Sequence, residues 1–215
     1  MTNTTSDFRR YRHPRLGEFY CVFVDTAWGG ADYCAAQFLC KDTLDVPIVY
    51  HSKTIATEMT PKIHLELERI FDITHVKPVV CFERNNGGVA EIERLATLNR
   101  QGKYTIYRDK TSTVPKLGFT TNSATRPVML SQLKEAIDAT LITLYDRPTI
   151  NELFSFVIVQ TSSSWKAQAE SGAHDDLIMS LAGAWQMYQT ETPEVMHNVS
   201  IYQPDPEMAQ LWRDI

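Results

Sequence analysis

No apolar run in this 215-residue sequence is long enough to cross a membrane, which takes about 18 such residues in succession. The N-terminal stretch MTNTTSDFRRYRHPRL lacks the hydrophobic segment that a secretory signal requires. Cysteine is scarce and never forms a Cys-x-x-Cys pair, so neither a disulfide framework nor a zinc site is expected. The cysteines lie in apolar, strand-like runs and predict buried free thiols of a reducing compartment: Cys21, Cys34, Cys40 and Cys81.

Positive charge is also in the minority, and the net charge is −5. The overall charge therefore does not indicate a protein that binds nucleic acid. The distribution is uneven. Between residues 100 and 126 there are six basic side chains and one acidic one, which leaves 15 basic and 25 acidic groups elsewhere. This segment is either an ordinary surface loop or a basic finger that contacts a polyanion. Its basic residues are Arg100, Lys103, Arg108, Lys110, Lys116 and Arg126.

The hydrophobic pattern predicts one α/β domain that begins with a three-stranded antiparallel meander. Strands are expected at 19–26, 33–41 and 47–55. A helix over 60–73 follows, with Thr60-Pro61 as its N-cap and first-turn pair.

After the meander, helices and strands alternate, which indicates a mixed sheet flanked by helices. Strands are expected at 76–83, 104–107, 157–160 and 165–169, and helices at 89–98, 127–144, 149–156 and from about His174. Residues 108–124 are expected to be irregular. The predicted organisation is a linker or arm over 1–17, the folded domain over 18–190 and a tail over 191–215.

Acidic residues lie at three places where a predicted element meets a loop. Asp25 ends the first strand, Glu83 ends the fourth, and Asp175-Asp176 open the last helix. If the first and fourth strands are parallel neighbours, Asp25 and Glu83 emerge together at the sheet edge where α/β folds bind ligands. Carboxylates about 5 Å apart repel by about 3 kcal/mol at an effective dielectric of about 20, so a cluster needs a cation. All-oxygen ligands favour Mg²⁺ or Mn²⁺.

Each acidic residue also has an interpretation without chemistry. An Asp in the first helical turn stabilises the helix dipole, which accounts for one of Asp175 and Asp176. Asp25 could form the turn before Gly29-Gly30. Glu83 is harder to explain, because it directly follows an apolar run where a lone buried carboxylate is costly.

Four local motifs carry a resemblance to one family. The stretches FVDTAWGGADY, CFERNNGG and GAHDDLIMSLAGAW resemble the three acidic motifs of the nuclease domain of tailed-phage terminase large subunits. A fourth, LGFTTNSATRPVML, resembles the loop and helix start between the second and third motifs. They occur in the expected order over nearly the whole predicted domain.

The resemblance implies a ribonuclease H-like fold and an endonuclease that uses two Mg²⁺ or Mn²⁺ ions to cut concatemeric viral DNA during genome packaging. Asp25 would bridge the metals, Glu83 would support the second, and Asp175 or Asp176 would complete the site. His174 is either close to the metal or only the helix cap, with the cap favoured. Arg84 and Asn85 either position a phosphate or shape the turn. The DNA contacts expected from the basic segment are Arg108, Lys110, Lys116 and Arg126.

The chain departs from the family in one respect, because it contains no G-x-x-x-x-G-K-[ST] phosphate loop. We therefore expect an isolated nuclease domain without the ATPase motor. The partners implied are double-stranded DNA, the terminase ATPase domain, the small terminase subunit and the portal, in the host cytoplasm and away from membranes. Two other functions stay open: a junction-resolving or RNA–DNA hybrid nuclease of the same fold, and a non-catalytic DNA-binding or docking module.

Overall fold

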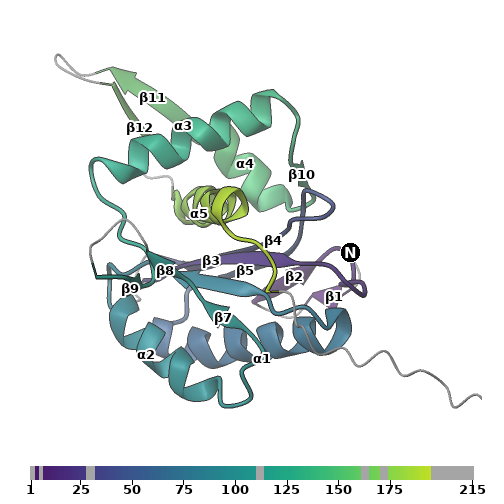
Figure 1. Cartoon of the computed structure of the whole chain (residues 1–215). Helices are drawn as coiled ribbons and strands as arrows, with labels where there is room; N and C mark the ends of the chain where they lie inside the picture. The colour runs from purple at the N-terminus through teal and green to yellow at the C-terminus, as the bar shows by residue number, and fades with distance from the viewer. Residues whose placement is uncertain are drawn as a thin grey trace, which may run out of the picture.

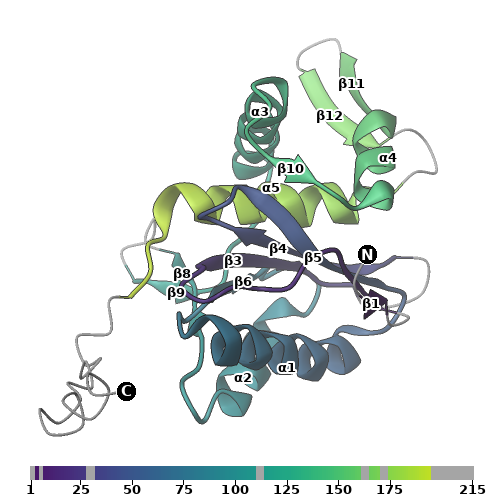
Figure 2. The same ribbon diagram turned by 90° about the vertical axis from the view of Figure 1, so that its right-hand side faces the viewer.

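The computed structural model describes residues 3–4, 7–27, 32–109, 114–160, 165–169 and 174–194. Within these ranges a central sheet has helices on both faces, and a further group of elements covers the helix on one face (Figures 1 and 2). The expected α/β class with a mixed sheet is therefore confirmed. No helix in the described ranges is long and apolar enough to span a bilayer.

The sheet contains the predicted meander, in which β3, β4 and β5 pair antiparallel. β6 lies parallel to β3 on its other side, and β7 lies parallel to β6. The strand order is β1-β2-β5-β4-β3-β6-β7, and β10 pairs with β5. The strands of this sheet are β1 (Asn3–Thr4), β2 (Phe8–Arg10), β3 (Tyr20–Asp25), β4 (Cys34–Cys40), β5 (Asp45–Ser52), β6 (Val79–Phe82), β7 (Thr105–Ile106) and β10 (Thr143–Leu144).

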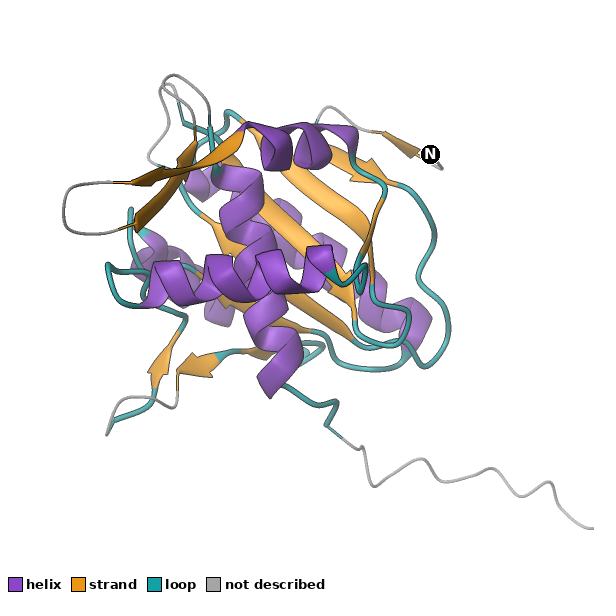
Figure 3. Ribbon diagram, turned by 90° about the horizontal axis from the view of Figure 1, so that it is seen from above, coloured by secondary structure: helices purple, strands orange, loops and turns teal. Residues whose placement is uncertain are grey.

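Helices α1 and α2 cover one face of the sheet and α5 covers the other (Figure 2). The elements α3, α4 and the β11–β12 hairpin lie beyond α5, and the helices cross over the strands when seen from above (Figure 3). The remaining elements are α1 (Ala56–Thr74), α2 (Gly88–Leu98), β8 (Arg108–Asp109), β9 (Lys116–Leu117), α3 (Thr125–Asp138), α4 (Arg147–Ser155), β11 (Phe156–Gln160), β12 (Trp165–Ala169) and α5 (Asp176–Thr190).

The two cores follow from the alternation of side chains along the buried strands. Val22 and Val24 of β3 pack in the core beneath α1, whereas Cys21 and Phe23 pack in the core beneath α5. α5 crosses closely over β3 at Gly183, where an added Cβ would lie 2.2 Å from the Phe23 ring. The four cysteines are buried and free, as the sequence predicts.

The first helix begins earlier than predicted. α1 starts at Ala56 with Ile55 in the N-cap position, so the assignment of Thr60-Pro61 as the cap and first turn is wrong. Thr60 lies inside the helix, and its hydroxyl donates to the Ala56 carbonyl at 3.0 Å and to Glu91 at 2.6 Å. The added first turn buries Ala56 and Met59 in the core and places Pro61 in the second turn, where its missing N–H costs one helical hydrogen bond.

The helix expected over 127–144 is shorter and begins earlier. α3 ends at Asp138, Thr140 adopts a left-handed φ of 53°, and residues 143–144 form β10 beside β5. Leu141, expected on the buried stripe, is exposed. Backbone pairing with β5 therefore replaces the last helical turns, which the apolar spacing alone does not reveal.

Part of the N-terminal segment 1–17 belongs to the sheet. Phe8 is buried in an edge-to-face contact with Tyr50, which anchors β2 against β5. Three of the four arginines of this segment are bound to acidic groups of the domain. Arg9 pairs with Asp146, Arg10 with Glu66, and Arg12 with both Asp45 and Glu18. These contacts stabilise β2 in the sheet, although the segment has no recognisable periodicity.

The segment 108–124, expected to be irregular, contains the short antiparallel pair β8–β9. Phe119 then forms an isolated bridge with Glu83, and its backbone N–H donates to the Phe82 carbonyl at 3.1 Å. The basic segment is therefore attached to the end of β6. Residues 195–215 lie outside the described residues, as do 110–113.

Candidate metal centre

Asp25 and Glu83 lie side by side because β3 and β6 are parallel neighbours in register. Val24 is paired with Phe82, and the Glu83 N–H donates to the Val24 carbonyl at 2.9 Å. Each carboxylate is the next residue along its strand, so alternation places both on the face covered by α5. Only 8% of Asp25 and 7% of Glu83 is exposed. The sequence left open whether these strands are parallel neighbours, and the structure shows that they are.

The turn after β6 holds the Glu83 carboxylate. The Asn85 side-chain amide donates to Glu83 Oε1 at 3.0 Å and to the Thr121 carbonyl at 2.7 Å. Arg84 donates to the Leu117 carbonyl at 2.6 Å, which ties the turn to β9. A Cβ at Gly88 would lie 1.7 Å from the Glu83 carbonyl oxygen, so this turn requires glycine there. Asn85 and Arg84 thus shape the turn in this structure.

The start of α5 brings two more carboxylates to the same place. Asp175 occupies the N-cap position, but its side chain makes no capping hydrogen bond and pairs with Arg126 instead. Asp176 is the first helical residue, and its Oδ2 is buried without a hydrogen-bond partner among the residues that the structure describes. His174 precedes the N-cap residue, so the cap interpretation of His174 is wrong; its Nδ1 lies 3.7 Å from Asp176 Oδ2.

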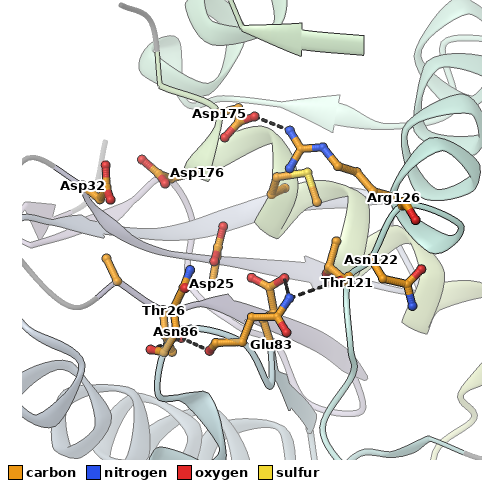
Figure 4. A pocket seen from close by; sticks show the side chains of 14 residues that line it. Asp25, Thr26, Asp32, Glu83, Asn86, Thr121, Asn122, Arg126, Asp175 and Asp176 are labelled. Atoms are coloured by element: carbon orange, nitrogen blue, oxygen red, sulfur yellow. Dashed lines mark hydrogen bonds and ion pairs between the residues drawn. The ribbon is translucent and has the colours of Figure 1, made fainter. Parts of the chain in front are cut away.

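The four predicted carboxylates line a cavity of about 560 Å³ (Figure 4). Arg126 is the one cationic side chain among the described residues that line it. Asp32, which the sequence analysis did not single out, also lines the cavity; its place in the FVDTAWGGADY stretch was the available signal. The acidic lining residues are Asp25, Asp32, Glu83, Asp175 and Asp176.

The cavity is electrostatically unfavourable for anions. Burial, followed by repulsion from Glu83 and a hydrogen bond between the two carboxyl groups, raises the pKa of Asp25 well above its ordinary value. Burial and repulsion from Asp175 raise the pKa of Asp176 to about 6. A neighbouring cation would relieve both effects.

The donor set fits a hard divalent cation, since all the acidic ligands are oxygens and Asp176 Oδ2 accepts no hydrogen bond from any described residue. In the described part of the chain, no three His, Cys, Asp or Glu side chains are already placed to hold one ion. The carboxylate of Asp175 is turned toward Arg126 (Figure 4). Side-chain rotation at the start of α5 is therefore needed before the carboxylates can share a metal.

The four basic residues expected to contact DNA lie in different surroundings. Arg108 and Lys116 are exposed on the β8–β9 pair. Lys110 lies outside the described residues. Arg126 is the second residue of α3 and lies in the acidic cavity, where its partner is Asp175. The structure thus separates Arg126 from the rest of the basic segment.

Glu152 of α4 is a further acidic residue near the site. Its Oε1 accepts the Ile178 N–H at 3.0 Å, so a neighbouring helix caps the start of α5 while the Asp175 side chain faces the cavity. Burial and the charge of Asp176 raise the pKa of Glu152 to about 7, against the lowering effect of the Ile178 hydrogen bond. No signal in the sequence indicated this role, because Glu152 lies outside the acidic motifs.

The pH dependence of stability provides a test of this environment. The folded protein holds the Glu152 proton more tightly than the unfolded chain does. The stability that the protonated Glu152 contributes is therefore lost as the pH rises through about 7. In EDTA, the melting temperature of Glu152→Gln relative to wild type should therefore increase between pH 5.5 and pH 8. His51, whose pKa is lowered to about 4 by burial, titrates equally in both proteins and cancels. A constant difference across this range would contradict the prediction.

No protein-family model matches the chain. Solved structures do. The large terminase nuclease domain of Thermus phage P74-26 aligns over 87% of this chain and 89% of its own, with 18% identity and a TM-score of 0.66. The large terminase nuclease of thermophilic phage G20c with bound cobalt aligns over 86% and 89%, with 21% identity and a TM-score of 0.67.

The magnesium-bound form of the G20c nuclease aligns over the same shares of the two chains, with 20% identity and a TM-score of 0.67. Those structures therefore contain divalent metals on the same architecture. At this level of identity the similarity defines the fold, and the ribonuclease H-like class expected from the motifs is confirmed. The chain has the fold of the phage large terminase nuclease domains.

Proposed function

We propose that this chain is a metal-dependent DNA endonuclease, the nuclease domain of a phage terminase large subunit that cuts concatemeric viral DNA during packaging. The main support is the placement of Asp25 and Glu83 on adjacent parallel strands, facing Asp175 and Asp176 across one cavity. The fold shared with the phage nucleases and the metals in two of those structures add support.

In this proposal the carboxylates of Asp25, Glu83 and Asp176 would hold the metals, and Asp175 would join them after release from Arg126. When bound, two Mg²⁺ or Mn²⁺ ions would supply activation of a water and stabilisation of the leaving 3′-oxygen in an in-line phosphodiester displacement. Asn85 keeps the Glu83 carboxylate oriented through its 3.0 Å hydrogen bond. Glu152 keeps the start of α5 in place, and so orients both aspartates.

The substrate would be double-stranded DNA, with the β8–β9 pair contacting its phosphates. The terminase ATPase domain, the small subunit and the portal are the partners implied by the family, and the reaction would take place in the host cytoplasm. Little sequence specificity is expected, because no helix-turn-helix or zinc-finger reader is recognisable in the sequence.

Plasmid nicking with Mg²⁺, with Mn²⁺ and with EDTA tests the proposal. We expect conversion of supercoiled plasmid to nicked and linear forms with either metal and none with EDTA. Far faster cutting of a four-way junction or an RNA–DNA hybrid than of plain duplex would instead indicate a different nuclease of this fold. Absence of both turnover and a metal-induced thermal shift would favour a non-catalytic DNA-binding module.

The basic finger predicts a change in salt dependence. Replacing Arg108, Lys110 and Lys116 by Ala should weaken binding of unrelated duplexes equally, because these side chains would contact phosphates rather than bases. Each lost contact reduces the slope of log affinity against log salt by about 0.9, so the triple variant should lose up to about 3 units. Salt titrations in an inactive background measure this. Parallel slopes for the triple variant and wild type would show that these three residues do not contact DNA. Lys62→Ala, on α1, is the control and should keep the wild-type slope.

A further inference from the structure

We propose that Arg126 couples metal binding to DNA binding: it pairs with Asp175 while the site is free of metal, and moves to a DNA phosphate when a divalent ion takes Asp175. This inference rests on the proposed function and adds a role for one residue. The observation behind it is that the one cationic side chain among the described lining residues is already bound to a prospective metal ligand.

The backbone that carries Arg126 is fixed relative to the metal centre. Asn122 Oδ1 accepts the N–H groups of Ala124 at 2.8 Å and Thr125 at 3.0 Å, which holds the first turn of α3. The Arg126 N–H donates to the Asn122 carbonyl at 3.0 Å. One residue earlier, the Thr121 carbonyl is held by Asn85, which also holds Glu83. The arginine therefore starts from a defined point beside the carboxylates.

The guanidinium itself is free to change partners. About a third of the Arg126 side chain is exposed, as is a similar share of Asp175, so the ion pair lies at the mouth of the cavity. An arginine fork matches phosphate oxygens as well as it matches a carboxylate. A phosphate brought to the metal centre would lie where the guanidinium can reach it.

The Asp175 carboxylate can likewise bind either of two cations, the Arg126 guanidinium or a divalent metal ion. Its side chain is not needed to cap α5, because Glu152 provides the cap. A divalent ion placed among Asp25, Glu83 and Asp176 attracts the Asp175 carboxylate with twice the charge of the guanidinium. Metal binding thus favours loss of the Arg126–Asp175 pair, and a phosphate that engages Arg126 favours release of Asp175.

The exchange makes the two binding events mutually favourable. By linkage, the factor by which metal tightens DNA binding equals the factor by which DNA tightens metal binding. Neutralising the acidic cluster accounts for part of this coupling in any variant. Only the part that depends on Arg126 reports the exchange of partners.

The experiment measures the affinity of a fluorescent 30-base-pair duplex for the full chain in EDTA and in saturating Ca²⁺, and the affinity for Ca²⁺ with and without duplex. Ca²⁺ is the probe because it takes oxygen ligands, and a gel after each titration checks that the duplex is intact. In wild type we expect Ca²⁺ to tighten duplex binding about tenfold or more, within the usual range of coupling between sites. In Arg126→Gln the factor should fall to about threefold or less, and Ca²⁺ alone should bind more tightly than to wild type.

Lys116→Gln is the matched control, since it removes one exposed positive charge on β9. It should weaken duplex binding equally with and without Ca²⁺ and leave the coupling factor of wild type. Arg126→Lys, which keeps the charge but loses the fork, should give an intermediate factor and covers the case in which the glutamine variant does not fold.

Two results would overturn the inference. An unchanged coupling factor in both Arg126 variants would mean that the arginine does not change partners. Weaker Ca²⁺ binding by Arg126→Gln in the absence of DNA would mean that the arginine holds Asp175 in place for the metal. If wild type binds no Ca²⁺, Mg²⁺ or Mn²⁺ at all, the proposed function itself fails, and the coupling inference fails with it.

Discussion

The Asp25→Asn protein should nick plasmid DNA at least ~100-fold more slowly than wild type at saturating Mg²⁺. Asparagine keeps the size of the side chain but removes the charge at the centre of the carboxylate cluster. Glu83 follows β6, and Asp175 and Asp176 lie at the start of α5 across the cavity. None of these three carboxylates can therefore occupy the position of Asp25 at the end of β3. The measurement is the initial rate of nicking, with Asp72→Asn on α1 as the control that should cut at the wild-type rate.

The same variant should fold at least as stably as wild type in EDTA. The raised pKa of Asp25 means that its ionised form is disfavoured in the folded protein, first by burial and then by Glu83. Its removal therefore raises the melting temperature, and the gain should grow with pH. Nicking by Asp25→Asn at a rate close to wild type would eliminate Asp25 as a metal ligand and the proposed mechanism with it.

Asp176→Asn should be more damaging than Asp175→Asn. Asp176 is the more buried of the two, its Oδ2 accepts no hydrogen bond from the described residues, and burial followed by repulsion from Asp175 raises its pKa to about 6. Asp175 is already neutralised by Arg126. We expect a loss of about 100-fold for Asp176→Asn and about tenfold for Asp175→Asn in the nicking rate.

Metal affinity should follow the same order, which isothermal titration with Mg²⁺ can measure for the two variants. Since both substitutions lie at the N-terminus of α5, each also removes a favourable interaction with the helix dipole, and melting curves in EDTA report that contribution. Equal and negligible effects on nicking would return both residues to the helix-dipole interpretation. A larger loss for Asp175→Asn would reverse the assignment of the direct ligand.

Local sequence patterns determined the strands that carry the first two carboxylates. The runs that end at Asp25 and Glu83 are apolar on consecutive residues, which is typical of a strand buried on both faces. That pattern places both carboxylates at strand ends, and the pairing of β3 with β6 then shows that the two strands are parallel neighbours. Patterns failed where pairing with the rest of the sheet decides the structure, as for β2 and β10, since a strand of two or three residues is too short to show a period.

The sequence by itself therefore determined the fold class, the buried cysteines and the strand-end positions of Asp25 and Glu83, because these depend on the polarity of neighbouring residues. Only the tertiary structure decided that Arg126 pairs with Asp175, 49 residues away, and that Glu152 caps a helix that begins 24 residues later. Such contacts depend on how α3, α4 and α5 pack over one another. The spacing of apolar residues specifies which face of each helix is buried, but not which helix lies against it.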